Sequence, residues 1–314
     1  MSSPFPLACP SDRSILERDG TGAAYLCRSC GGRYPIEAGV VRFLEKDDSF
    51  YEGKYLTDNT VAWVPRWDHW PWNLPLWLMR SGYISAVRRH VPAGATLLEF
   101  GCASGVRYLS RRYRTIGLDL SAGSLARVAD LYALSLQVDL TRGLPLPDAS
   151  IDAAISSFVW EHIVPEAKPG VLAEFRRVLR PGGKLILLYD VDSDHPLYRR
   201  LRAADPARFH EVLIEREGHT GWQDAADNAA AFESAGMRVL EHRGKEKLLI
   251  GPAMYHKVEE WPGAFRRWAR VGLQFEYGQR FQLYNAFTRV LDETLGRVLP
   301  ASWARVMVTV CERT

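Results

Sequence analysis

Short apolar runs of strand length recur along the chain from about residue 78 to the C-terminus. Five of them follow one another at the spacing of crossover connections: residues 96–100, 115–120, 136–140, 152–158 and 184–190. A helical pattern over residues 167–179 ends at Arg180-Pro181-Gly182-Gly183, and a second over residues 223–235 ends at Gly236. Strands that alternate with helices predict a mostly parallel sheet covered by crossover helices.

The last third of the chain departs from this alternation. A strand follows Gly236, and residues 304–312 alternate small or polar with apolar side chains, as a half-buried strand does. The residues between these two strands, about 245–300, have a helical pattern. We therefore predict a helical insert, acting as a lid, before the last strand of the sheet.

The first 78 residues differ in composition from the rest. Residues 1–45 are turn-rich, carry three of the five cysteines and are too few to form a core without a staple. Residues 46–78 combine closely spaced aromatic residues with prolines that interrupt a helix: Tyr51, Tyr55, Trp63, Pro65, Trp67, Trp70, Pro71, Trp72, Pro75 and Trp77. We predict a small module at 1–45, an aromatic linker or cap at 46–78 and an α/β domain at 79–314.

The bulk composition is that of a globular protein. Of the 314 residues, 47% are hydrophobic and 25% charged, and the net charge of +3 is too small to predict nucleic-acid binding. No apolar run approaches the roughly 18 residues that span a bilayer. The N-terminal residues lack the basic start and apolar stretch of a secretory signal. With few cysteines, clustered as in a metal site, we expect a cytoplasmic protein.

Polar and small residues gather at the ends of the first three predicted strands. Glu99, Gly101 and Gly105 form E-x-G-x-x-x-G, where the glycines permit a tight turn against a ligand at a helix N-terminus. Asp119 ends the second strand, where a carboxylate can accept both ribose hydroxyls, and Asp139 ends the third, near an adenine amine. The spacing excludes the dinucleotide fingerprint G-x-G-x-x-G, and a P-loop lysine is lacking.

The segments LLEFGCASG, TIGLDLS, LQVDL, SSFVWEHI and LRPGGKLIL resemble, in order and spacing, the class I S-adenosylmethionine-dependent methyltransferases. The resemblance covers about residues 80–245 and the final strand. It implies a doubly wound, Rossmann-like sheet of seven strands whose last strand is antiparallel and forms a hairpin with its predecessor. It also implies a cofactor site: Glu99, Gly101 and Gly105 at the methionine portion, Asp119 at the ribose, Leu120, Asp139 and Leu140 around the adenine, and Phe158 in the transfer channel.

Cys9, Asp12, Cys27 and Cys30 are arranged as two knuckles. Two thiolates in C-x-x-C can approach one tetrahedral ion. The segment resembles the zinc-ribbon module that precedes several bacterial methyltransferases and that also occurs as a free-standing methyltransferase activator. Aspartate stands where the fourth cysteine is expected, so both a Cys3Asp zinc site and a degenerate ribbon without metal are compatible with the sequence.

Two histidines are candidates for a catalytic base. His219, before the helix at 223–235, is our first choice, and His162, after the strand at 152–158, is the second, with a structural role as its alternative. A third histidine, His195, follows a run of acids, Asp190, Asp192 and Asp194, that we interpret as solvated. Residues 156–159 are Ser-Ser-Phe-Val and not a tetrapeptide of the N-P-P-Y type. This argues against an exocyclic nitrogen of a nucleobase as the methyl acceptor.

These features predict a methyltransferase that acts on a small molecule or glycan, by O-methylation, in natural-product or surface-polysaccharide biosynthesis. The alternatives are an RNA methyltransferase, against which the weak basic excess argues, and a non-catalytic methyltransferase-like scaffold. The aromatic stretch at 46–78 either caps the cofactor and acceptor or joins the two domains. Arginines of the helical insert, including Arg266, Arg267 and Arg270, face either an anionic acceptor or solvent. A homodimer is left open.

Overall fold

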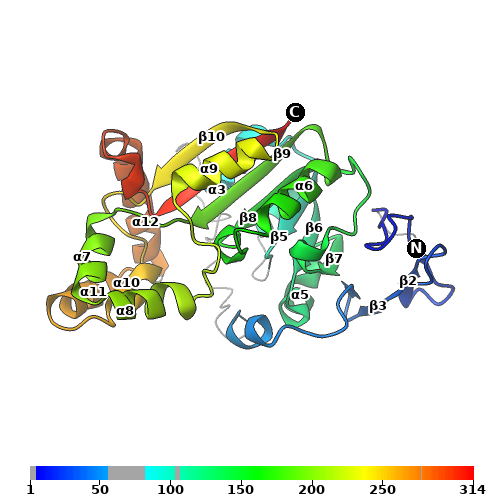
Figure 1. Cartoon of the computed structure of the whole chain (residues 1–314), viewed down its shortest axis with the longest axis horizontal. Helices are drawn as coiled ribbons and strands as arrows, with labels where there is room; N and C mark the ends of the chain where they lie inside the picture. Colours follow the sequence, from blue (N-terminus) through cyan, green and yellow to red (C-terminus); the bar gives the residue numbers. More distant parts are fainter. Residues whose placement is uncertain (1–4, 56–81, 103–106, 277) are drawn as a thin grey trace.

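The computed structural model describes residues 5–55, 82–102, 107–276 and 278–314. Its centre is a twisted sheet in the order β7-β6-β5-β8-β9-β11-β10 (Figure 1). These strands are β5 (Thr96–Phe100), β6 (Arg114–Asp119), β7 (Leu134–Gln137), β8 (Ile151–Ser157), β9 (Leu179–Asp190), β10 (Met237–Lys245) and β11 (Val306–Arg313). The first five in this order are parallel.

The final strand runs against its neighbours, as predicted. β11 pairs antiparallel with β9, where Val308 lies opposite Leu188, and antiparallel with β10, where Met237 lies opposite Arg313. The alternating pattern of residues 304–312 is therefore that of a strand inserted between two others. The doubly wound, mostly parallel fold is confirmed.

The sheet is larger than the seven strands predicted. Four N-terminal strands extend it: β1 (Glu17–Arg18), β2 (Ala24–Leu26), β3 (Arg33–Glu37) and β4 (Val40–Arg42). β4 pairs parallel with β7, with Val41 opposite Leu136, and Val40 and Val41 are each 1% exposed. Since β7 would otherwise leave its backbone groups open at a sheet edge, β4 both satisfies them and buries apolar side chains.

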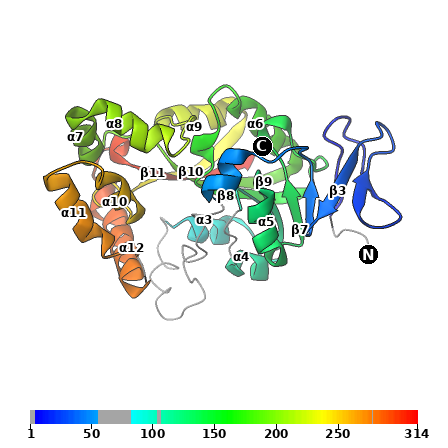
Figure 2. The ribbon, with the colours of Figure 1, turned by 90° about the horizontal axis from the view of Figure 1, so that it is seen from below.

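Helices cover both faces of the sheet (Figure 2). One face carries α3 (Tyr83–His90), α4 (Arg107–Arg112) and α5 (Ala122–Val128), and the other carries α6 (Lys168–Val178) and α9 (Ala225–Ser234). The predicted helices at 167–179 and 223–235 are thus confirmed within two residues. α9 begins at the cap Asp224, whose side chain accepts from Asp227 N, and ends before Gly236, which has φ +73°.

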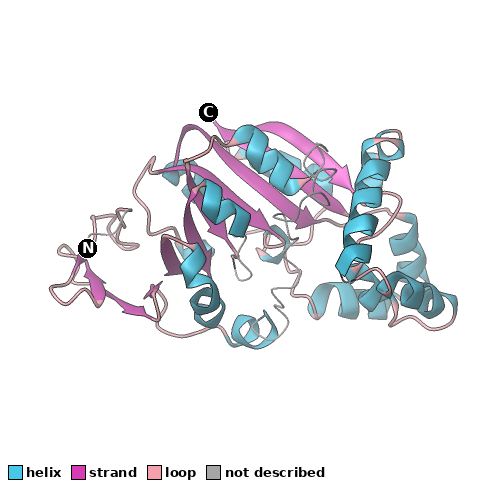
Figure 3. Ribbon diagram, turned by 180° about the vertical axis from the view of Figure 1, so that it is seen from behind, coloured by secondary structure: helices cyan, strands magenta, loops and turns pink. Residues whose placement is uncertain are grey.

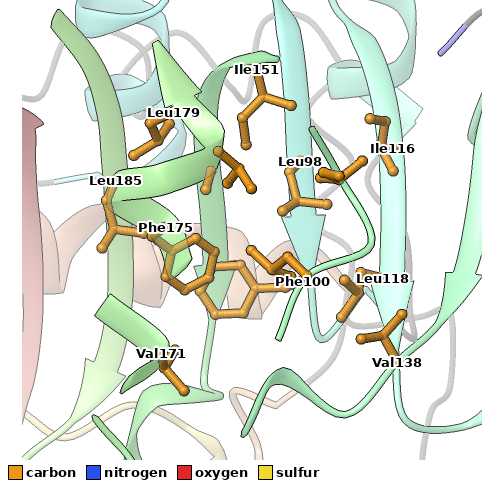
Figure 4. Close-up of a cluster of buried hydrophobic side chains, with 14 of the residues drawn as sticks. Leu98, Phe100, Ile116, Leu118, Val138, Ile151, Val171, Phe175, Leu179 and Leu185 are labelled. Carbon is orange, nitrogen blue, oxygen red and sulfur yellow. The ribbon is translucent and has the colours of Figure 1, made fainter. Parts of the chain in front are cut away.

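The core follows from alternation along each strand. Leu97 and Leu98 are adjacent in β5 and are both fully buried, yet they contribute to hydrophobic clusters on opposite faces of the sheet. On the α6 face, Phe100 and Phe175 lie with ring centroids 4.7 Å apart among Leu98, Ile116 and Leu118 (Figure 4). A helix-covered sheet of this kind leaves its strand ends accessible to ligands.

A separate group of helices lies at one end of the sheet, opposite the N-terminal strands (Figures 1 and 3). It combines two insertions: α7 (Pro196–Ala204), α8 (Pro206–His210) and η6 (Glu211–Glu215) with α10 (Ala253–Val258), α11 (Ala264–Leu273) and α12 (Gly278–Glu293). They share their own buried cluster, which includes Tyr198, Phe209, Met254 and Trp261. The predicted insert at 245–300 is helical, but it is only part of this group.

Short helical turns complete the described chain: η1 (Tyr51–Tyr55), η3 (Ala129–Leu131), η4 (Leu140–Arg142), η5 (Trp160–His162), η7 (Leu295–Arg297) and η8 (Ala301–Trp303). No helix among the described residues combines the length and apolar character that a membrane span needs.

Candidate cofactor and transfer site

The turn after β5 brings a bare backbone to the carboxyl end of the sheet. Gly101 has φ +64°, and a β-carbon built there would lie 2.1 Å from Val159 Cγ2. Its N–H donates to the Leu118 carbonyl at 2.8 Å, which ties the turn to β6. Only glycine fits this position. Gly105, the other glycine of the predicted motif, lies outside the described residues.

Glu99 is buried in β5, next to this turn. The Tyr132 hydroxyl donates to Glu99 Oε2 at 2.8 Å, and burial raises the pKa of Glu99 to about 7 despite that hydrogen bond. The carboxyl group thus has a fixed orientation. A cationic ligand bound next to it would favour its ionised form.

Asp119 and Asp139 stand at the ends of β6 and β7, as the sequence predicts. Asp119 is 7% exposed and accepts from Ser121 N at 2.9 Å, and Asp139 accepts from Thr141 N at 2.9 Å. Leu120 is half-buried, and its carbonyl accepts from Gln137 Nε2 at 3.0 Å, while Leu140 packs at the margin of the core. Since β5, β6 and β7 are parallel neighbours, Glu99, Asp119 and Asp139 share one edge of the sheet.

The end of β8 is strained. Phe158 has φ +58°, a value that a bulky L-residue rarely adopts, and its side chain is 46% exposed. Its N–H donates to the Leu188 carbonyl at 2.7 Å, which holds the backbone in place. Backbone strain and an exposed aromatic ring together are typical of a ligand-contacting position.

Beyond Phe158, the chain brings Glu161, His162 and His219 together. One ligand atom of each lies within 4.8 Å of the others, and the two imidazole centroids are 5.1 Å apart. Two hydrogen bonds join the loops that carry them: Gly221 N donates to the Glu161 carbonyl at 2.8 Å, and His162 Nδ1 donates to the Gly218 carbonyl at 2.9 Å. The two histidines that the sequence singled out are therefore neighbours.

Burial controls the ionisation of this group. Together with the neighbouring Lys257 and His162, it lowers the pKa of His219 to about 3. It also raises the pKa of Glu161 well above its usual range, helped by the nearby carboxylate of Asp190. His219 is thus neutral at physiological pH.

The segment at residues 50–55 covers the space between the strand-end acids and the histidines. The Tyr51 ring lies 6.4 Å from the His162 ring, and Phe50 packs against Gly218. Burial, together with the nearby carboxyl groups of Asp48, Asp119, Asp139 and Glu161, raises the pKa of Tyr51 to about 12. Tyr51 is therefore close to both groups of side chains. The remaining aromatic residues of 46–78 from Lys54 onward lie outside the described side chains.

The buried Lys168 side chain connects the loop before α9, which carries His219, to the start of α6. Lys168 is 1% exposed, and its Nζ donates to the Gly221 carbonyl at 2.8 Å, Gln223 Oε1 at 2.7 Å and Asn228 Oδ1 at 3.2 Å. The Trp160 indole donates to the same Asn228 oxygen at 2.7 Å. The short distance between His162 and His219 thus depends on a polar network beneath them.

Cys9, Asp12, Cys27 and Cys30 also come together. Cys9 Sγ lies 3.5 Å from Cys30 Sγ, and Cys27 Sγ lies 3.4 Å from Asp12 Oδ2. The hydrogen bond from Ser14 N lowers the pKa of Asp12, so its carboxylate is ionised. Around one tetrahedral zinc ion, two sulfurs would be about 3.8 Å apart and a sulfur and an oxygen about 3.6 Å apart. The donor set fits that ion in type and spacing.

Sequence reasoning overlooked two residues of the candidate site, Glu161 and Lys168. Glu161 directly precedes His162, so its place in the cluster could have been suspected, whereas nothing in the sequence signals the buried lysine network. His195 lies elsewhere: its Nδ1 accepts from Leu197 N and caps α7, and Asp192 pairs with Arg202. Among the described residues, the acids around His195 do not form a group suited to a metal ion.

The sheet order and the helices on both faces define the class of the protein, a doubly wound α/β protein. The family follows from comparison with known proteins. Residues 98–187 match the model of a methyltransferase domain. A ubiquinone/menaquinone biosynthesis C-methyltransferase from Syntrophotalea carbinolica is 32% identical over 202 residues, which cover 57% of this chain and 84% of that protein. The chain belongs to the class I S-adenosylmethionine-dependent methyltransferases.

Other relatives cover less of their own length. A Mycolicibacterium smegmatis protein named as a probable S-adenosylmethionine-dependent methyltransferase is 31% identical over 186 residues, 53% of this chain and 66% of that protein. The chain spans 63% of a Geobacillus kaustophilus methyltransferase of uncharacterised function. It thus matches less than two thirds of these relatives.

The fold agrees with a solved structure. One chain of the complex between the Haloferax volcanii Trm112 methyltransferase activator and a methyltransferase aligns with a TM-score of 0.50 at 20% identity. The alignment covers 85% of this chain and 99% of that chain.

Proposed function

We propose that this chain binds S-adenosylmethionine along the ends of β5, β6 and β7 and transfers its methyl group to an oxygen of a small-molecule or glycan acceptor. The observation that carries the proposal is the shared edge of Glu99, Asp119 and Asp139 beside the Gly101 turn. Asp119 would accept from the ribose hydroxyls, Asp139 with Leu120 and Leu140 would border the adenine, and Glu99 with Gly101 would face the methionine portion.

S-adenosylmethionine supplies an electrophilic methyl group on a sulfonium sulfur. In the transfer, the acceptor oxygen forms a bond to the methyl carbon, the carbon–sulfur bond breaks with its electron pair remaining on sulfur, and the hydroxyl proton is lost. The enzyme therefore has to align the acceptor and accommodate the departing proton. Phe158, exposed at the end of β8, and Tyr51, close to both the strand-end acids and His162, are suited to orient an acceptor.

The predicted base, His219, is supported by its position and opposed by its ionisation. Its ring adjoins His162 on the acceptor side, but a group with a pKa of about 3 takes up a proton weakly. His162, the second candidate, already donates from Nδ1 to Gly218, so only its Nε2 lone pair can receive a proton.

We also infer that Cys9, Asp12, Cys27 and Cys30 hold a structural zinc ion. The mutual distances between their donor atoms and the ionised state of Asp12 support this inference. Such an ion would cross-link the N-terminal module, residues 1–45, which has few residues with which to form a core of its own.

Titration of S-adenosylhomocysteine into the purified protein by calorimetry tests the cofactor site. Asp119→Ala should weaken binding by about 1–3 kcal/mol, because a carboxylate that bonds to two hydroxyls is removed. Asp119→Asn keeps an acceptor for Ser121 N, so the turn after β6 is preserved. Weaker binding by this variant would therefore report loss of the ligand contact and not a disturbed turn. Asp130→Ala, an exposed aspartate in η3, is the matched control and should bind as the parent does.

Binding by the parent would be followed by an acceptor screen with labelled cofactor, in which small hydroxylated molecules and glycans are compared with RNA. If the parent does not bind S-adenosylhomocysteine, the proposed function is wrong. Binding without transfer to any acceptor class would favour the scaffold alternative.

A further inference from the structure

Glu161, His162 and His219 form a compact group outside the cradle of strand-end acids. They come from two separate loops, the one after β8 and the one before α9, and they approach one another beyond the end of β8. We propose that these three side chains bind a divalent first-row transition-metal cation. Its part in the reaction rests on the proposed methyl transfer, but the site itself does not.

The spacing of the group is close to that of a metal site. The three ligand atoms lie within 4.8 Å of one another. Two ligands at about 2.0–2.2 Å from one tetrahedral ion are about 3.3–3.6 Å apart. Side-chain rotations that shorten the separations by up to about 1.5 Å therefore bring all three to one ion.

Two of the three side chains present buried polar atoms that lack any hydrogen-bond partner within the described part of the chain. Glu161 is 1% exposed and its Oε2 is unpartnered, and His219 is 6% exposed and its Nδ1 is unpartnered. Buried polar atoms in a folded protein are nearly always satisfied, so two orphans within one small group call for a ligand. A cation accepts electron pairs from both atoms at once.

His162 is held as metal-binding histidines usually are. Its Nδ1–H donates to the Gly218 carbonyl at 2.9 Å, which places the remaining lone pair on Nε2 and fixes the plane of the ring. Thr220 Oγ1 donates to the His162 carbonyl at 2.8 Å. Both the ring and the backbone of His162 are therefore hydrogen-bonded to the loop that carries His219.

Acidic and basic groups both lie next to the three side chains. Glu161 Oε1 accepts from Asp190 N at 3.3 Å, and the Asp190 carboxylate faces Glu161 from the end of β9. Lys257 of α10 is a positive group nearby, and its Nζ lies 3.3 Å from Glu217 Oε2, which offsets its charge. The carboxyl groups of Glu161 and Asp190 and the Glu217-paired Lys257 therefore adjoin the two imidazoles, and Arg305 Nη1 lies 4.0 Å from Asp190 Oδ1.

The donor set selects the kind of metal and what it would do. Two imidazoles and one carboxylate suit iron, cobalt, nickel or zinc better than calcium or magnesium, and three protein ligands leave positions open. Beside the transfer site, such a cation would bind an oxygen of the acceptor and lower the pKa of its hydroxyl. This points to acceptors with adjacent oxygens, such as a catechol or a hydroxy acid.

Titration of the chelator-treated protein of residues 1–314 with Co²⁺ distinguishes this site from the cysteine site. Cobalt bound to thiolates shows strong charge-transfer absorption, whereas cobalt bound to imidazole and carboxylate shows only weak visible bands. The parent should bind an equivalent of the second kind. His219→Gln and Glu161→Gln should lose that equivalent, while His210→Gln, at an exposed histidine that pairs with Glu215, should keep it.

Cys30→Ser provides the complementary control, because it should affect only the thiolate band. Each variant is also titrated with S-adenosylhomocysteine, which reports on folding and on the cofactor site without the metal. The proposal is overturned if a folded parent that binds S-adenosylhomocysteine shows no imidazole-type cobalt, or if His219→Gln retains it. Loss of S-adenosylhomocysteine binding in the parent would contradict the proposed function and leave the cobalt result to stand alone.

Discussion

At the scale of single residues, the turn after β5 requires a residue without a β-carbon. In Gly101→Ala, the new methyl would lie 2.1 Å from Val159 Cγ2 at a φ of +64°. Gly94 is the matched control, because it has φ +81° but a methyl group added there would meet nothing within 4 Å. We expect Gly94→Ala to lower the free energy of unfolding by about 1 kcal/mol, because alanine is strained at this positive φ. Gly101→Ala should lower it by about 1–3 kcal/mol more, because its methyl group also overlaps Val159.

Urea unfolding of the two variants measures this difference. Adding Val159→Ala to Gly101→Ala removes the clashing methyl group and should recover part of the lost stability and of the affinity for S-adenosylhomocysteine. Equal destabilisation by the two alanines would mean that the turn relaxes around Gly101 and that its fit is not specific.

The residues of the cofactor edge were predictable because their positions depend on local pattern. An acid or glycine that directly follows an apolar run lies at a strand end, and parallel strand ends share one edge. The pairing of His162 with His219 was beyond such reasoning, since it depends on a backbone hydrogen bond from Gly221 to Glu161 and on the Lys168 network. The roles assigned to all these side chains stay predictions.

At the scale of elements, helix α7 begins at a histidine whose protonation would remove its cap. His195 is 6% exposed, and its Nδ1 accepts from Leu197 N at 3.1 Å. Burial and the neighbouring Arg305 together lower the pKa of His195 to about 4. Because the folded pKa lies below the unfolded value, the folded state binds fewer protons, and stability falls as the pH drops from about 6.5 towards 4.

His195→Asn isolates this effect, since asparagine also caps a helix but does not titrate in this range. Between about pH 7 and pH 5, the parent should lose about 2 kcal/mol more unfolding free energy than the variant does. Denaturant unfolding at both pH values gives the comparison. Parallel losses in the two proteins would show that other groups govern the acid sensitivity.

The elements themselves were predicted unevenly, for a physical reason. Strands such as β5 and β8 contain short apolar stretches of strand length, and α6 is a regular helix, so each carries its own signal. The helices at 196–215 are three short pieces of 9, 5 and 5 residues, too brief for a clear period. β4 has only 3 residues and owes its existence to pairing with β7, a contact that no local pattern encodes.

At the scale of the whole molecule, the N-terminal module shares one core with the methyltransferase domain. Leu7, Leu16 and Tyr25 belong to the same buried cluster as Leu98 and Phe175. Ala8 N donates to the Pro145 carbonyl at 3.0 Å, and Arg13 pairs with Glu174 at 2.9 Å. Loss of order in the module should therefore reach β7, the strand next to the proposed adenine site.

Removal of the proposed zinc ion with a chelator tests this coupling. If the ion is bound at about a hundredfold excess over its Kd, chelation should make opening of the module easier by about 2.7 kcal/mol. Amide hydrogen exchange should then accelerate in β4 and at β7, including Leu136, while the β10–β11 pair at the far side of the sheet stays protected. Cys27→Ser should reproduce the pattern without chelator, whereas Cys311→Ser, which removes a buried sulfur from β11, should not. Faster exchange confined to residues before β4 would contradict the coupling, because the module would then open without disturbing the edge of the cofactor site.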